Sequence, residues 1–133
     1  MATIVIDTSV IIAVIADEPE KPALIALTTG VNLVAPASVP WEIGNAFSAM
    51  LKRKRITIAQ AQQALKAYQR ISIRFIDVEL GESLVLADRL GIYAYDAYIL
   101  QCALGLRCPV LALDQGLIEA AKRTGVKVLQ ARQ

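Results

Sequence analysis

The stretch Thr3-Ile4-Val5-Ile6-Asp7-Thr8-Ser9 decides the fold class of this chain. Its β-branched run, residues 3–6, predicts a buried strand. Three polar residues, 7–9, then separate that strand from an apolar helix predicted at about 9–16. The pattern returns near the C-terminus, where the apolar run 109–113 ends on Asp114. Strands buried on both faces are typical of parallel sheets that are covered by helices.

Strands and helices alternate along the rest of the sequence. Further strands are predicted at 33–35, 73–76 and 126–129, with the third strand, 73–76, in a more exposed edge position. Helices are predicted at about 22–29, 39–52, 58–70, 79–90, 96–104 and 115–124, with Ser38 and Thr57 as N-caps. This alternation predicts a three-layer α/β fold: a central, mostly parallel sheet of about five strands with helices on both faces. At 133 residues, the length fits one domain, 1–133.

The composition excludes several classes of chemistry. There is no histidine, so triads and zinc sites that need imidazole are ruled out. Cys102 and Cys108 are the only cysteines, and we expect both to be reduced and inert. The N-terminus lacks the positive region of a secretory signal, and no apolar run is long enough to span a bilayer. We therefore expect a cytoplasmic protein that does not enter a membrane.

Four acidic residues stand out by position: Asp7, Glu42, Asp96 and Asp114. Asp7 and Asp114 follow strands, and ligands of open α/β sheets bind beyond the carboxyl ends of the strands. Glu42 and Asp96 lie near predicted helix starts, and Asn45 shares a helix face with Glu42. Each aspartate could simply cap a helix. Several converging carboxylates, however, would repel one another unless a cation lay between them, and Mg²⁺ or Mn²⁺ suits such oxygen ligands.

The other charges are mainly basic. The chain has 14 Lys plus Arg and 12 Asp plus Glu, so setting the four acids aside leaves 14 basic against 8 acidic residues. The densest basic run is Lys52-Arg53-Lys54-Arg55, about 15 Å along the helix from Glu42. Such a run suits contact with a phosphate backbone, although cations are favourable at any helix C-terminus. The hydrophobic share of 56% also favours a second subunit or partner over part of the surface.

In order and spacing, the motifs resemble the PIN-domain family. The matching motifs are Asp7-Thr8-Ser9 after a strand, Glu42 with Asn45 on the third helix, Tyr95-Asp96-Ala97 opening a later helix, and Leu113-Asp114 after the fourth strand. The resemblance extends over residues 4–128. By length and spacing it is closest to VapC-type toxins of type II toxin–antitoxin modules.

The resemblance implies a Mg²⁺- or Mn²⁺-dependent endoribonuclease that is usually dimeric and is held inactive by a cognate antitoxin. Asp7 and Asp96 would be the chief metal ligands, completed by Glu42 and Asp114. The supporting polar residues would be Thr8, Ser9 and Asn45. Many relatives carry Thr or Ser two residues before the last acid, where this sequence has Ala112. Asp114 is therefore the weakest of the four matches.

Two other functions are compatible with acids at strand ends. A signalling receiver domain also binds Mg²⁺ there, but it needs an acidic pair after the first strand and a lysine after a late strand, which this sequence lacks. A PIN-like scaffold that only binds RNA or protein would need none of the four acids. Phosphorylation by acetyl phosphate would identify a receiver domain. Absence of a saturable Mn²⁺ site would identify the PIN-like scaffold.

Overall fold

The computed structural model describes residues 2–131, and its centre is a sheet of five parallel strands. The strands are β1 (Thr3–Ile6), β2 (Asn32–Pro36), β3 (Arg74–Ile76), β4 (Val110–Leu111) and β5 (Val128–Leu129). Their order across the sheet is β3-β2-β1-β4-β5. The predicted fold class is therefore confirmed, and β3 lies at one edge as its mixed sequence indicated.

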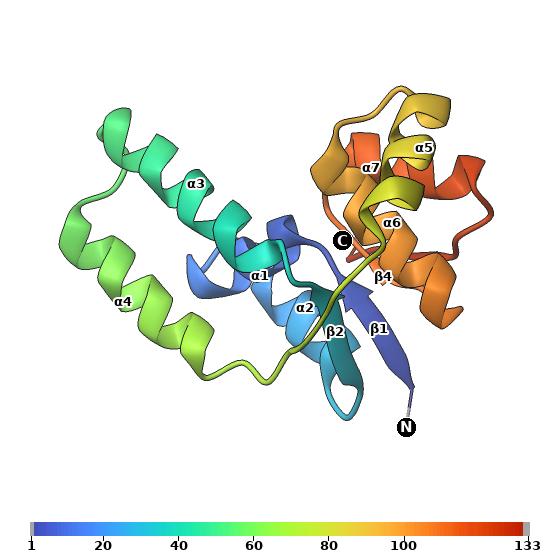
Figure 1. Cartoon of the computed structure of the whole chain (residues 1–133). Coiled ribbons are helices and arrows are strands. Elements are labelled where there is room, and N and C mark those ends of the chain that lie inside the picture. Colours follow the sequence, from blue (N-terminus) through green and yellow to red (C-terminus); the bar gives the residue numbers. More distant parts are fainter. Residues whose placement is uncertain (1, 132–133) are drawn as a thin grey trace.

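Helices cover both faces of the sheet, which makes three layers. They are α1 (Thr8–Ile15), α2 (Lys21–Thr28), α3 (Val39–Lys52), α4 (Ile58–Gln69), α5 (Leu80–Leu90), α6 (Ala94–Leu106) and α7 (Gln115–Arg123). Helices α1 to α4 lie on one side and α5 to α7 on the other (Figure 1). None of these helices is long and apolar enough to cross a membrane.

The core sits where the aliphatic strands meet α1 and α6. Val5 and Val110, which pair across β1 and β4, are fully buried, as are Val34 of β2 and Leu100 of α6. Burying each such side chain contributes about 1.5–3 kcal/mol. These contacts fix β1 and β4 as neighbours, so the chain segments that follow them emerge side by side at one edge of the sheet.

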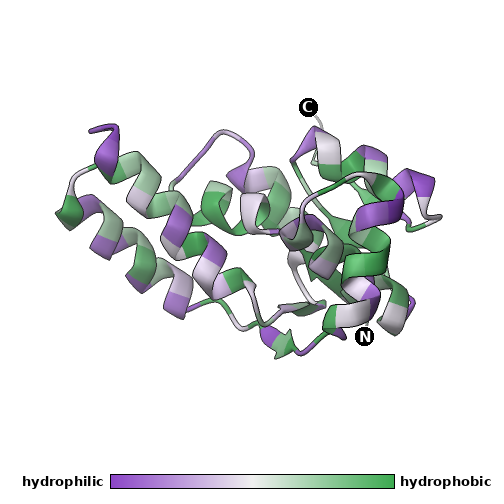
Figure 2. Cartoon of the chain, turned by 45° about the horizontal axis from the view of Figure 1, so that its top comes forward, coloured by the Kyte–Doolittle hydropathy of each residue, from purple (hydrophilic) through white to green (hydrophobic). Residues whose placement is uncertain are grey.

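Helix α3 and helix α4 form a hairpin that extends away from the sheet (Figure 1). The buried residues of α3 are Val39, Ile43 and Phe47, all in its first nine residues, and Met50, farther along, packs against the core while partly exposed. The connection at the far end contains Arg53, Lys54 and Arg55 and is exposed. Figure 2 shows this end of the hairpin as its most hydrophilic part.

Several predicted boundaries were wrong, for identifiable reasons. Helix α6 begins at Ala94, two residues before Asp96, and it runs through Gly105 to Leu106. Arg107 follows the helix in a left-handed conformation. Pro109 disfavours a helical backbone at Cys108, the residue before it, so the helix cannot continue. Strand β4 is shorter than predicted and pairs only over Val110–Leu111. The carbonyl of Pro109 still accepts a hydrogen bond from the backbone N–H of Val5, at 3.0 Å.

Both predicted residues stand at N-cap positions, but only one of them makes a capping bond. Thr57 caps α4 in a capping box: its hydroxyl accepts from the backbone N–H of Gln60, and the Gln60 side chain accepts from the backbone N–H of Thr57. Ser38 precedes α3, but its side chain makes no capping bond because its own backbone is already helical. In the described part of the chain, its hydroxyl is the one buried side-chain polar atom without a partner.

Candidate functional site

A pocket of about 350 Å³ lies at the carboxyl edge of the sheet, and all four predicted acids line it. The lining residues are Asp7, Thr8, Ser9, Ile12, Glu42, Asn45, Ala46, Asp96 and Asp114. Three helices (α1, α3 and α6) and the segments that follow β1 and β4 contribute to it, so residues up to 107 positions apart in the sequence share one cavity. The predicted supporting residues Thr8, Ser9 and Asn45 are part of the same lining.

The sheet and two helix starts position the acids. Asp7 follows β1 directly, and its backbone N–H donates to the carbonyl of Leu111 at 3.1 Å, which ties it to β4. Asp114 lies three residues beyond that carbonyl, before α7. Glu42 and Asp96 occupy the first turns of α3 and α6. The strands thus supply two acids and the helices two more from opposite faces of the sheet.

Two hydroxyl groups hold two of the carboxylates. Ser9 donates to Asp7 Oδ2 at 2.6 Å, and its oxygen accepts from the backbone N–H of Leu113 at 3.3 Å. Thr8 donates to Glu42 Oε1, also at 2.6 Å. Bonds of this length to a charged acceptor are among the stronger hydrogen bonds in proteins. The polar residues after β1 therefore orient acids from β1 and from α3, a role that their sequence position did not reveal.

The alternative that the aspartates are merely helix caps holds for one of them. Asp114 Oδ2 accepts from the backbone N–H of Leu117 at 2.9 Å, which is an N-cap bond of α7. Asp7 occupies the N-cap position of α1, but its side chain makes no such bond. Asp96 lies inside the first turn of α6 and does not cap it. Asp7 and Asp96 therefore have no capping role that would explain their burial.

Burial and mutual repulsion raise the pKa values of three acids. Asp7 is only 4% exposed, and desolvation raises its pKa, with a smaller contribution from the charge of Asp114. Desolvation raises the pKa of Glu42. The hydrogen bond from Thr8 opposes this rise, and the charge of Asp7 adds to it. Desolvation and the charges of Asp7 and Asp114 raise the pKa of Asp96 to about 6. The pocket therefore concentrates negative charge at a cost to the folded state.

The chemistry of these groups fits a hard divalent cation. Every charged side chain in the lining is a carboxylate, and Mg²⁺ and Mn²⁺ prefer oxygen ligands. Within residues 2–131, however, no three acids or cysteines are gathered tightly enough to enclose an ion. Ser9 and Thr8 each hold one carboxylate oxygen of Asp7 and Glu42 by hydrogen bonds. The donor set fits a cation, and its geometry is more open than a closed structural metal site.

The predicted basic run lies outside the pocket. Lys52, Arg53, Lys54 and Arg55 are all exposed at the far end of the α3–α4 hairpin. They are separated from Glu42 by most of the length of α3, about 15 Å. No lysine or arginine lines the carboxylate pocket.

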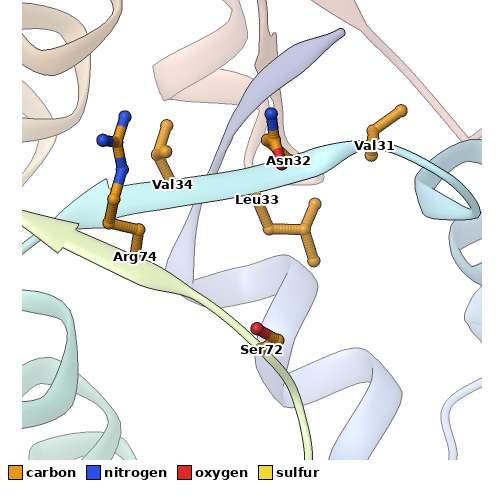
Figure 3. Close-up of a pocket in the computed structure, with 6 residues that line it drawn as sticks. All are labelled: Val31, Asn32, Leu33, Val34, Ser72 and Arg74. Atoms are coloured by element: carbon orange, nitrogen blue, oxygen red, sulfur yellow. The ribbon is translucent and has the colours of Figure 1, made fainter. Parts of the chain in front are cut away.

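A second cavity, of about 360 Å³, lies along β2 and β3. Figure 3 shows Asn32 and Arg74 rising from these two strands on the same side of the sheet, with Ser72 on the chain before β3. This cavity contains no acid and no cysteine. It therefore offers no ligands for the metal chemistry that the sequence predicts.

The comparisons with known proteins agree with the fold. A family model described as PIN domain matches residues 4–123. Among solved structures, PAE2754 from Pyrobaculum aerophilum is 19% identical with a TM-score of 0.71, covering 96% of this chain and 83% of the other. VapBC2 from Rickettsia felis, solved bound to a DNA fragment from their promoter, is 15% identical with a TM-score of 0.68, covering 96% and 98%.

A PilT N-terminus domain protein, SSO1118 from Sulfolobus solfataricus P2, is 15% identical with a TM-score of 0.51, covering 97% and 87%. At these identities the likeness shows the fold. No curated protein matches the sequence.

Proposed function

The chain belongs to the PIN-domain family, and from that premise we propose that it is a divalent-metal-dependent endoribonuclease. The observation that carries the proposal is the pocket at the carboxyl edge of the sheet, where Asp7, Glu42, Asp96 and Asp114 come together. The alternative of a receiver domain is abandoned, because receivers have the strand order 2-1-3-4-5, whereas this sheet has β3-β2-β1-β4-β5.

The roles of the acids follow from their surroundings. Asp7 and Asp96 are the proposed chief ligands, because neither is used to cap a helix. Glu42 completes the set and can orient a water, since Thr8 fixes one of its oxygens and leaves the other available. Asp114 would contact the cation from the β4 side, through the carboxylate oxygen that does not cap α7. When bound, the cation supplies the Lewis acidity that activates water and offsets charge on the phosphate.

The substrate and partners belong to the same proposal. RNA is the proposed substrate, and the exposed run Lys52 to Arg55 is a proposed contact for its phosphate backbone. The similarity to VapBC2 supports a cognate antitoxin as partner and the role of a toxin, with a homodimer as the expected assembly. We also propose a cytoplasmic location and one nuclease domain over 1–133, of which residues 1, 132 and 133 lie outside the described part.

The test is cleavage of RNA by the purified protein with Mg²⁺, with Mn²⁺ and with a chelator. We expect cleavage only with metal, and a loss of at least about 100-fold in Asp7→Asn and Asp96→Asn. Asp88→Asn is the matched control, because Asp88 is exposed on α5 and does not line the pocket. If Asp7→Asn cuts as fast as the unaltered protein, the mechanism is wrong. A chain that neither cuts RNA nor has a saturable Mn²⁺ site is the PIN-like scaffold instead.

A further inference from the structure

Two aromatic side chains are more exposed than any other large hydrophobic residue in the described part of the chain. Tyr93 is 89% exposed and Trp41 75%, against 66% for Val85, the next in order. Tryptophan is normally well buried in folded proteins, because its large apolar surface is costly to leave in water. Aromatic side chains are enriched in protein interfaces and in sites for single-stranded nucleic acids.

Both residues stand at helix starts that flank the carboxylate pocket. Trp41 lies one turn before Asn45 on α3, and Tyr93 three residues before Asp96 at the start of α6. Trp41 and Asn45 are four residues apart in α3 and share a helix face, and Asn45 lines the pocket. Tyr93 has an extended backbone at the N-cap of α6, three residues before the pocket-lining Asp96. Because α3 and α6 cover opposite faces of the sheet (Figure 1), the two aromatic residues flank the site from opposite sides.

Neither ring is occupied by a neighbouring aromatic residue. Tyr95, the other aromatic residue next to Asp96, packs edge-on against Tyr98 with ring centroids 6.0 Å apart. Trp41 and Tyr93 take part in no such pair among the described residues. Their faces are available to a flat ligand.

The electrostatics of the pocket make such a contact useful for a nucleic acid. The lining carries four carboxylates and no cation, so it repels the phosphates that would have to approach it. The exposed cations at 52–55 lie about 15 Å away along α3. Apart from the proposed metal, the pocket thus has no group that attracts phosphate, and base–aromatic stacking can add affinity there that depends on neither phosphate charge nor base sequence.

We propose that Trp41 and Tyr93 stack on bases of a single-stranded nucleic acid, one on each side of the phosphodiester held at the acids. The inference deepens the proposed nuclease function and rests on it. It defines the substrate as unpaired, because bases inside a duplex are stacked on each other and cannot reach protein rings. Each stacked base is expected to strengthen binding about tenfold.

The sequence provides a direct probe, because Trp41 is the only tryptophan. Asp7→Asn protein is titrated with an eight-nucleotide single-stranded RNA while the tryptophan fluorescence is recorded. An abasic oligomer of equal length and a blunt RNA duplex are the comparison ligands. We expect quenching by the single strand, with at least about tenfold weaker binding of both others. Absence of quenching, or equal quenching by the abasic oligomer, would overturn the proposal.

Substitutions test the two rings separately by anisotropy of a labelled oligomer, which requires no cleavage. Trp41→Leu and Tyr93→Leu should each weaken binding about tenfold, whereas Trp41→Phe and Tyr93→Phe should retain most of it. Phe75→Leu on β3 is the control, since Phe75 is an exposed aromatic residue at the edge of the sheet. Unchanged binding in both leucine variants would refute stacking on bases. The two exposed rings would then be assigned to contact with a protein partner.

The outcomes separate this inference from the proposed function. Base-dependent quenching without any cleavage would keep the stacking and reject the nuclease. Cleavage by Trp41→Leu and Tyr93→Leu at unaltered affinity would keep the nuclease and reject the stacking.

Discussion

Replacing Asp96 with asparagine should make the metal-free protein more stable at neutral pH while removing its activity. The Asp96 carboxyl is partly desolvated and faces the charges of Asp7 and Asp114, which raise its pKa from 3.8 to about 6. This rise corresponds to about 3 kcal/mol. Because about half of the group remains in contact with solvent, screening reduces the figure to about 1–2 kcal/mol.

The sign of the pH dependence follows from proton binding. The folded chain holds the Asp96 proton to a higher pH than the unfolded chain does, so stability falls as pH rises from 3.8 to about 6. Asparagine carries no charge and escapes this loss. The gain of the variant should therefore be near zero at pH 4 and complete at pH 7, where it would raise Tm by about 3–8 °C.

The assay is thermal unfolding by circular dichroism at pH 4, 5, 6 and 7 in the presence of a chelator. Asp88→Asn serves as the control, since that exposed side chain on α5 lies outside the pocket. If Asp96→Asn melts below the unaltered protein at pH 7, desolvation and repulsion in the pocket do not destabilise the charged carboxylate. The electrostatic reasoning would then be refuted whatever the variant does to RNA.

Three further predictions concern the same edge of the sheet and one distant helix. Mn²⁺ at about 100 times its Kd should stabilise the protein by about 2.7 kcal/mol, and an unchanged Tm in both Mn²⁺ and Mg²⁺ would contradict a metal site. Ser9→Ala should cost about 2 kcal/mol in urea unfolding, because it removes the bond to Asp7 and takes the acceptor from the partly buried N–H of Leu113; Ser48→Ala, at an exposed serine on α3, is its control. Thr57→Ala should cost about 1 kcal/mol without altering cleavage, since the capping box of α4 is remote from the acids; a large loss of activity would connect α4 to the site.

The fold was predictable because its strongest signals are local. The aliphatic run before Asp7 and the one before Asp114 each need burial on both faces, and a parallel sheet provides it. The Thr57 capping box was equally visible, since its two partners are three residues apart. The start of α6 was missed because Tyr93 is a poor N-cap by side-chain chemistry, and its extended backbone alone begins the helix.

The four acids of the site could be predicted from the sequence, but their arrangement in space could not. Asp7 and Asp114 could be placed together because strands of one sheet end at the same edge. The bond from Thr8 to Glu42 joins residues 34 positions apart and depends on how α3 packs against α1. Packing of that kind has no local signature, so the residue pattern alone does not indicate that a hydroxyl after β1 orients an acid of another element.

The α3–α4 hairpin places its acidic residue and its basic residues at opposite ends. Glu42 lies at the base of the arm near the sheet, whereas the basic residues lie at its far end, which borders the end of α1. A change of one turn at that end would move the basic residues by about 5.4 Å, and Met50 and Ile56, which pack against the core there, would have to be repacked. The length of α3 therefore sets the distance between the basic residues and the acids.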